Sequence, residues 1–202
     1  MIPKILHYVW VGDPMPDKYK RCVDQWHTAL PDYEIRAWTN DNVPQTPYVQ
    51  TAFVAKKWIN AADYLRVWVV AQEGGIYLDA DTEILKPFDD LLQYDFFVGT
   101  FSGGNKFQFA ANAVIGAPVN DPIAAGMLGA MNVFLNGDEP VFEFSGPPLI
   151  TAIVKRKLGI EAAPAEILTQ RGVTGFPPEF FFPPNGEITD RTYIRHHGFK
   201  MW

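Results

Sequence analysis

In the first part of the chain, the spacing of apolar residues switches between the period typical of strands and the period typical of helices. The apolar run at 5–11 predicts a buried strand, and the alternation at 33–38 predicts a second one. Between them, apolar residues at helical spacing predict a helix over 17–30, which Pro31-Asp32 ends. A strand, a helix and a strand at this spacing form a βαβ unit, which indicates a parallel sheet.

The rest of the chain continues the same α/β pattern. An apolar stripe predicts one long helix over 53–73, and the short apolar run 76–78 after Gly74-Gly75 predicts a buried strand. Beyond it we expect strands at 96–100, 111–116 and 193–197, helices at 121–135 and 146–158, and loops at 102–105 and 176–184. The expected fold class is therefore α/β, a mixed, mostly parallel sheet flanked by helices in a single domain over 1–202.

Composition narrows the functions that are open to this chain. Apolar residues make up 48% of its 202 positions, which is enough for a sizeable core, and the net charge of −6 argues against a general nucleic-acid binder. The single cysteine, Cys22, excludes an internal disulfide and fits a reducing compartment. No apolar stretch approaches the roughly 18 residues of a transmembrane helix, and Met1–Lys4 leads directly into a strand, so we expect a cytoplasmic protein.

Two aspartates one residue apart, Asp79 and Asp81, follow the buried strand 76–78. Open α/β sheets bind their ligands at the carboxyl ends of strands. Neighbouring carboxylates repel each other unless a cation compensates, and Mg²⁺ or Mn²⁺ with phosphate oxygens would do so. The spacing alone is a weak signal, because roughly one such pair is expected by chance in a few hundred residues and a capping turn also explains it.

Three other groups could act together with this pair. Asp63 and Arg66 are three residues apart on the predicted helix and share a face, as part of a site or as a surface ion pair. His196 and His197 end the last predicted strand, and one of them could supply a third metal ligand. Trp10 is a core residue or, if a nucleotide binds, a wall for its base.

Segments along nearly the whole chain match, in order, the motifs of one enzyme family. They are Ile2–Gly12, Gln25-Trp26, Pro31–Glu34, Ala61–Arg66, Gly74–Asp81, Leu85–Pro87, Asn112–Ala117, Ser145–Pro147 and Tyr193–His197. Together they resemble family-32-type glycosyltransferases with a DXD sugar-binding region, which include the yeast initiating α-1,6-mannosyltransferase and bacterial capsule enzymes of polysaccharide biosynthesis. The glucosylating domains of large clostridial toxins are more distant relatives. Two departures are Ala62, where many relatives carry Ser, and the C-terminal run 197–202.

The resemblance implies a GT-A fold and a retaining transferase that uses Mn²⁺ or Mg²⁺. Asp81, with Asp79, would bind the metal on the donor diphosphate, and Asp79 would also contact ribose and sugar. His196 is the preferred third ligand and His197 the less favoured one, since neighbours on a strand point to opposite faces.

The resemblance also assigns the residues around the donor. These are Val9, Trp10 and Val11 at the nucleobase, Tyr77 at the nucleotide, Asp63 and Arg66 at the sugar hydroxyls, Asn112 beside the reacting sugar, and Trp202 as a closing residue. The implied donor is a UDP-sugar or GDP-mannose, with UDP-sugars favoured. The implied acceptor is a glycan, a lipid-linked glycan or a protein.

Two other functions compete with this one. Ile76–Thr82 also fits the strand-Asp-x-Asp-x-Thr signature of haloacid dehalogenase phosphohydrolases, in which Asp79 would be the nucleophile. That family needs a late acidic pair, and Phe142 occupies the second acidic position after Gly137-Asp138, so the pattern fails. A non-catalytic sugar-nucleotide or glycan-binding module is the other alternative, because the C-terminal run diverges.

Overall fold

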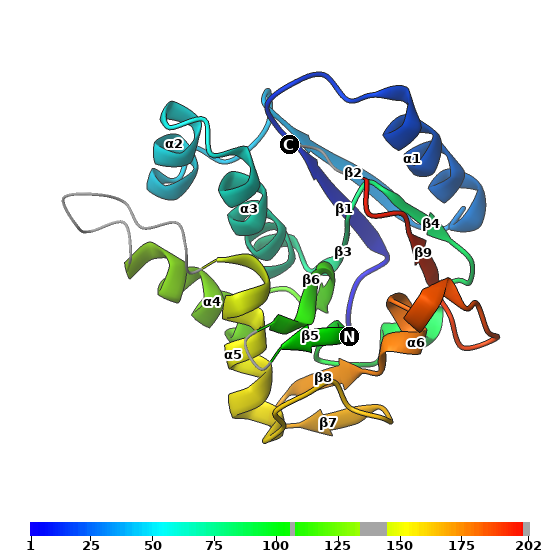
Figure 1. Cartoon of the computed structure of the whole chain (residues 1–202). Helices are drawn as coiled ribbons and strands as arrows, with labels where there is room; N and C mark the ends of the chain where they lie inside the picture. Colours follow the sequence, from blue (N-terminus) through cyan, green and yellow to red (C-terminus); the bar gives the residue numbers. More distant parts are fainter. Residues whose placement is uncertain (106–107, 134–144, 200–202) are drawn as a thin grey trace.

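A seven-stranded mixed sheet organises this computed structural model, which describes residues 1–105, 108–133 and 145–199 (Figure 1). In spatial order its strands are β2 (Glu34–Thr39), β1 (Ile5–Trp10), β3 (Gly75–Leu78), β6 (Gln108–Ala117), β5 (Phe96–Asn105), β8 (Val173–Phe176) and β7 (Leu168–Gln170). β1 is parallel to β2 and β3, and β5 is parallel to β8, whereas β6 is antiparallel to both of its neighbours. The predicted α/β class is confirmed.

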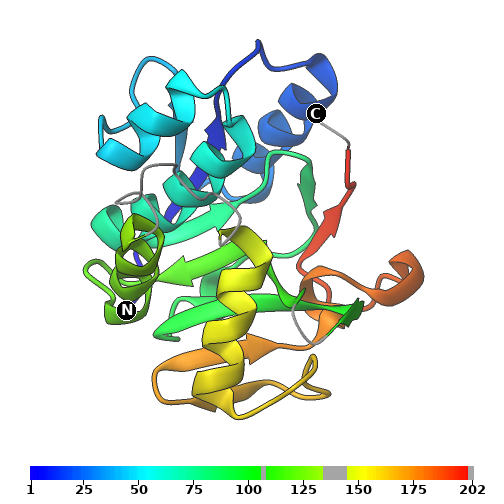
Figure 2. The same cartoon turned by 60° about the vertical axis from the view of Figure 1, so that its left-hand side comes forward.

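Helices cover both faces of this sheet, because β1 and β3 direct alternate apolar side chains into two separate cores. The helices are α1 (Asp17–Ala29), α2 (Pro47–Val54), α3 (Trp58–Glu73), α4 (Pro122–Val133), α5 (Gly146–Leu158) and α6 (Pro178–Phe181), with 3₁₀ turns η1 (Asp89–Leu91) and η2 (Pro184–Gly186). Helices α2 to α5 pack on one face, where α5 lies across β5 and β6 (Figure 2), and α1 and α6 pack on the other. No helix in the described part of the chain has the length and apolar composition needed to cross a membrane.

A second, two-stranded sheet holds the C-terminal part of the chain beside the two aspartates. It consists of β4 (Thr82–Ile84) and β9 (Ile194–His196), paired antiparallel with Thr82 opposite His196. Gln25 on α1 exchanges two hydrogen bonds with the backbone of Ile84, at 2.8 and 3.0 Å, and the indole of Trp26 donates to the carbonyl of Thr82 at 2.9 Å. The Gln25-Trp26 pair therefore fixes the strand that follows the aspartates.

The predicted helix over 53–73 is wrong, because the structure has two helices in its place. Thr46 caps α2, accepting a hydrogen bond from the amide of Val49, and Pro47 occupies the first turn, so this helix begins earlier than the apolar stripe suggests. Lys56, at φ 52°, then separates α2 from α3. Thr46-Pro47 is thus the sequence signal for the start of α2, which apolar periodicity alone does not show.

Other predicted boundaries also change. The glycine-rich segment 102–105 belongs to β5 and is not a loop, since a register shift in the β5–β6 ladder accommodates Gly103 at φ 81°. The predicted loop at 176–184 contains the short helix α6. Asp121 caps α4, because its carboxylate accepts hydrogen bonds from the amides of Ile123 and Ala124. The predicted end of that helix at 134–135 and Trp202 lie outside the described residues.

The glycine pair before β3 is required by close backbone packing. At Gly75, φ is 101° and a Cβ would lie 2.5 Å from the carbonyl oxygen of Ile5 on β1. The buried ring of His7 is 2.8 Å from the carbonyl of Gly74 through Nε2, and its Nδ1 accepts from the Trp38 indole at 3.1 Å. This arrangement fits a neutral imidazole with its proton on Nε2, and burial lowers the pKa of His7 to about 4.

Acid is therefore expected to destabilise the fold through His7. Because its pKa falls from 6.5 to about 4 on folding, the unfolded chain binds more protons within this window, and stability is lost as the pH falls through it. Between pH 7 and pH 4.5 the wild type should lose about 2 kcal/mol more unfolding free energy than His7→Gln. Urea unfolding at the two pH values measures this, and equal losses in both proteins would refute the assignment.

Candidate active site

Asp79, Asp81 and His196 meet at the carboxyl end of β3, beside the small sheet. One possible ligand atom from each lies within 4.8 Å of the others. Nε2 of His196 is 3.3 Å from Oδ1 of Asp81 and 3.9 Å from Oδ2 of Asp79. His197 is exposed and stacks on the ring of Phe199, with ring centroids 4.9 Å apart. The structure thus brings the imidazole of His196, and not that of His197, to the two aspartate side chains.

Each aspartate is held through one oxygen and turns the other toward the histidine. Oδ1 of Asp79 accepts a hydrogen bond from the Tyr77 hydroxyl at 2.7 Å and lies 3.3 Å from Nη1 of Arg66. Oδ2 of Asp81 accepts from the backbone amide of Phe199 at 2.8 Å. Tyr77 is buried beneath Asp79 and orients this carboxylate, while its predicted contact with the nucleotide stays a prediction.

The charges of this cluster compensate one another. Burial works to raise the pKa of Asp79, but the Arg66 guanidinium and His196 together hold that pKa below its ordinary value. Burial alone would lower the pKa of His196, whereas the neighbouring carboxylates of Asp79 and Asp81 raise it to about 9. Two inward carboxylate oxygens and an imidazole nitrogen fit Mn²⁺ or Mg²⁺, and a divalent cation would replace the proton of His196 in balancing the two acids.

A second polar cluster is buried next to these three residues. Oδ1 of Asp63 accepts from the Asn112 amide at 2.7 Å and lies 3.5 Å from Nη2 of Arg66, while Oδ2 accepts from the Ser145 hydroxyl at 3.1 Å. Arg66 also donates to the carbonyl of Asn112 at 3.0 Å and so stands between Asp63 and Asp79. Asp63 and Arg66 are each only 7% exposed, which excludes the alternative of a surface ion pair.

The start of α5 completes this second cluster. The family resemblance marks Ser145–Pro147 as a motif but does not predict its contact with Asp63. Gly146 has φ 59°, and a Cβ there would lie 2.6 Å from Oδ2 of Asp63 and 3.1 Å from the side-chain nitrogen of Asn112. A glycine is therefore needed for α5 to begin against these side chains. Burial raises the pKa of Asp63 in spite of the neighbouring Arg66.

The carboxyl end of β1 lies beside the cluster of Asp79, Asp81 and His196. Trp10 stands there between two buried valines, Val9 and Val11. Its ring packs against Tyr19 with centroids 4.6 Å apart, and Tyr19 packs edge-on against Phe199. Because the amide of Phe199 holds one of the aspartates, the predicted nucleobase residues and the predicted metal ligands are neighbours.

Solved glycosyltransferases share this fold. The structure matches the PaToxG glycosyltransferase with a TM-score of 0.61 at 19% identity, covering 77% of this chain and 69% of that one. It matches the galactosyltransferase LgtC, solved in complex with donor and acceptor sugar analogs, with a TM-score of 0.51 at 12% identity, covering 87% and 74%. The chain therefore has the predicted GT-A fold, which excludes the haloacid dehalogenase alternative.

Sequence comparisons also find similarity to glycosyltransferases. Residues 16–97, which contain Asp79 and Asp81, match the family described as glycosyltransferase sugar-binding region containing DXD motif. Inositol phosphoceramide mannosyltransferase 3 of Schizosaccharomyces pombe is 33% identical over 103 residues, which cover 46% of this chain and 28% of that relative. The chain thus spans less than a third of this relative. The predicted resemblance is confirmed, since residues 16–97 are similar to the DXD-containing sugar-binding region of glycosyltransferases.

Proposed function

We propose that this chain transfers a hexose from a nucleotide-sugar to a hydroxyl acceptor, using Mn²⁺ or Mg²⁺ held by Asp79, Asp81 and His196. The observation that carries this proposal is the pair of inward carboxylate oxygens that face one imidazole nitrogen at the carboxyl end of β3. A UDP-sugar is the favoured donor and GDP-mannose the second choice. The acceptor is a glycan, a lipid-linked glycan or a protein.

The neighbouring residues fit the needs of this reaction. A bound cation supplies the positive charge that stabilises the departing nucleoside diphosphate. Arg66 keeps Asp79 ionised, and the cluster of Asp63 and Asn112 offers hydrogen-bonding groups to the donor sugar. Asp63 is a poor nucleophile, because both of its oxygens already accept hydrogen bonds from protein side chains.

Transfer with retention of configuration needs no nucleophile from the protein. The acceptor oxygen bonds to the anomeric carbon on the face from which the diphosphate oxygen departs. The bond between the anomeric carbon and that oxygen breaks, and its electron pair stays with the diphosphate. The acceptor proton passes to the departing oxygen, so the charges balance without a covalent enzyme intermediate.

A donor screen tests this proposal. The protein is incubated with Mn²⁺ and, separately, UDP-glucose, UDP-galactose, UDP-GlcNAc and GDP-mannose, and free nucleoside diphosphate is measured. Slow hydrolysis of one donor that stops on removal of the cation with EDTA is the expected result. Donor binding without any turnover would instead support the non-catalytic sugar-nucleotide-binding module.

The two adjacent histidines provide a matched pair of variants. His196→Ala is expected to raise the Mn²⁺ concentration for half-maximal donor hydrolysis by about tenfold or more, because it removes a ligand atom. His197→Ala should change this concentration by less than about twofold, because that side chain only stacks on Phe199. A metal titration of both variants decides between them, and the reverse ranking would move the ligand to His197.

A further inference from the structure

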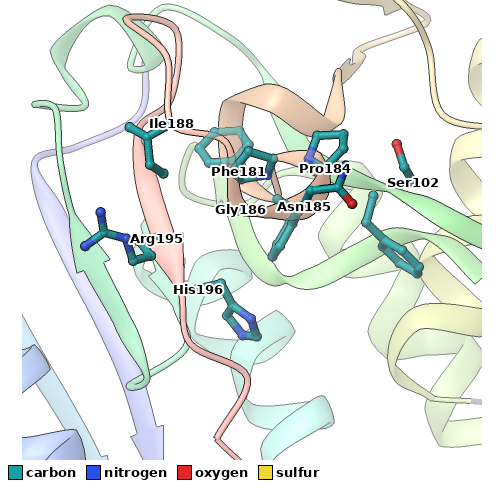
Figure 3. Close-up of a pocket in the computed structure, with 11 residues that line it drawn as sticks. Ser102, Phe181, Pro184, Asn185, Gly186, Ile188, Arg195 and His196 are labelled. Carbon is teal, nitrogen blue, oxygen red and sulfur yellow. The ribbon is translucent and has the colours of Figure 1, made fainter.

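A groove opens on the side of His196 that carries α6 and η2 (Figure 3). The part beside His196 has a volume of about 340 Å³, and its lining includes Phe101, Ser102, Phe181, Phe182, Pro184 and Asn185. A second part of about 420 Å³ is lined by Pro164, Pro177, Pro178, Glu187 and Thr189, among others. Ser102, Pro184 and Asn185 line both parts, so the two parts of the groove adjoin at these residues, and the first part reaches His196.

The groove wall next to His196 is conformationally restricted. Phe182 meets the His196 ring edge-on, with centroids 5.6 Å apart. Pro183 and Pro184 restrict the backbone of η2, and Asn185 follows in the left-handed region at φ 56°. A wall of this kind is preformed, so a ligand binds without the entropic cost of ordering it.

Most of the charged groups along the groove are already paired. Arg195 and His196 leave opposite sides of β9 in Figure 3, and the Arg195 guanidinium lies 2.5 Å from a Glu83 carboxylate oxygen. Glu179, which lines the second part, pairs with Arg191 at 2.6 Å. Apart from the exposed Glu187, the described walls therefore offer aromatic, proline and aliphatic surface together with the neutral polar side chains of Ser102, Asn185 and Thr189.

We propose that this groove binds the acceptor as a neutral oligosaccharide of at least two sugar units, with the reacting hydroxyl beside His196. The inference rests on the proposed function, since it places the acceptor next to the metal ligands. The C–H faces of sugar rings suit Phe and Pro surfaces, and their hydroxyls suit Ser102 and Asn185. Each part of the groove lies in the size range of small-molecule sites, so the two parts accommodate consecutive rings.

Two variants at the junction of the two parts test this inference. Asn185→Gly combined with Ser102→Ala removes the polar groups, and glycine keeps the left-handed backbone at 185. Ser102→Trp narrows the junction by bulk. Both leave the residues assigned to donor and metal unchanged, so Mn²⁺-dependent donor hydrolysis without an acceptor should stay at the wild-type rate.

The assay uses the donor that the screen selects, with maltose, lactose, α-1,6-mannobiose and chitobiose compared with their monosaccharides. At least one disaccharide should be a better acceptor than its monosaccharide, and the double variant should lower its kcat/KM about tenfold, as expected for two lost hydrogen bonds. Ser102→Trp should remove the advantage of the disaccharide while sparing the monosaccharide.

The outcomes separate this inference from the proposed function. Unchanged disaccharide kinetics in both variants would overturn the inference. If the wild type hydrolyses the donor but transfers sugar to a peptide, or to none of the saccharides, the inference is also wrong. Absence of donor hydrolysis in the wild type would instead overturn the proposed function itself.

Discussion

Asp81→Asn is expected to lower metal-dependent donor hydrolysis by at least about a hundredfold, the largest effect on activity predicted for this chain. Oδ1 of Asp81 faces His196 at 3.3 Å, so the substitution removes negative charge where the cation would bind. The remaining amide oxygen can still accept the hydrogen bond from the Phe199 backbone, which Oδ2 accepts in the wild type. The measurement is nucleoside diphosphate release at saturating Mn²⁺, with near-ultraviolet circular dichroism to show that the fold is kept.

An exposed aspartate supplies the control for this experiment. Asp41 lies in the loop after β2, so Asp41→Asn changes the net charge equally and should leave hydrolysis unchanged. Asp81→Ala should also abolish turnover, although it loses the hydrogen bond to Phe199 as well. Hydrolysis by Asp81→Asn within about twofold of the wild-type rate would remove Asp81 from the metal site.

The position of the aspartate pair at the end of a strand can be predicted from the sequence, because the residues on either side of the strand end give consistent signals. The buried run 76–78 is short and apolar, and the charged pair follows it without a break, so strand and strand end were both predicted. The approach of His196 could not be derived from periodicity. It depends on β4, which has only three residues, pairing with a strand far away in the sequence, and segments this short carry too few residues to show a period.

The contacts of the buried Asp63 cluster and the groove beside His196 are harder to predict from the sequence, for a related reason. The contact of Ser145 and Gly146 with Asp63 joins residues of α5 and α3, and only tertiary packing brings them together. The Pro- and Phe-rich composition of segment 176–184 predicts a loop, and nothing local to it indicates that it forms the wall of a groove beside His196. The family resemblance marks Ser145–Pro147 as a motif but does not predict its contact with Asp63, and neither resemblance nor periodicity predicts the groove wall.

Arg66→Met is expected to lower the free energy of unfolding by about 3–5 kcal/mol, the largest effect on stability predicted for this chain. Arg66 is buried between Asp63 and Asp79, and its guanidinium lies over the Tyr77 ring, 4.9 Å from the centroid. Methionine fills similar space but leaves two carboxylates without their cation. Urea unfolding with and without Mn²⁺ measures the loss, which the cation should partly reverse because it compensates Asp79.

A surface arginine shows why burial decides the size of this effect. Arg36 also pairs with two acids, Glu34 and Glu73, but its side chain is 32% exposed, so Arg36→Met should cost about 1 kcal/mol or less. Adding Asp79→Asn to Arg66→Met should recover part of the loss, because it removes one uncompensated charge, and the coupling between the two changes should exceed about 1 kcal/mol. Equal losses for the two arginines, with no coupling to Asp79, would show that packing around Arg66 and not its charge stabilises this site.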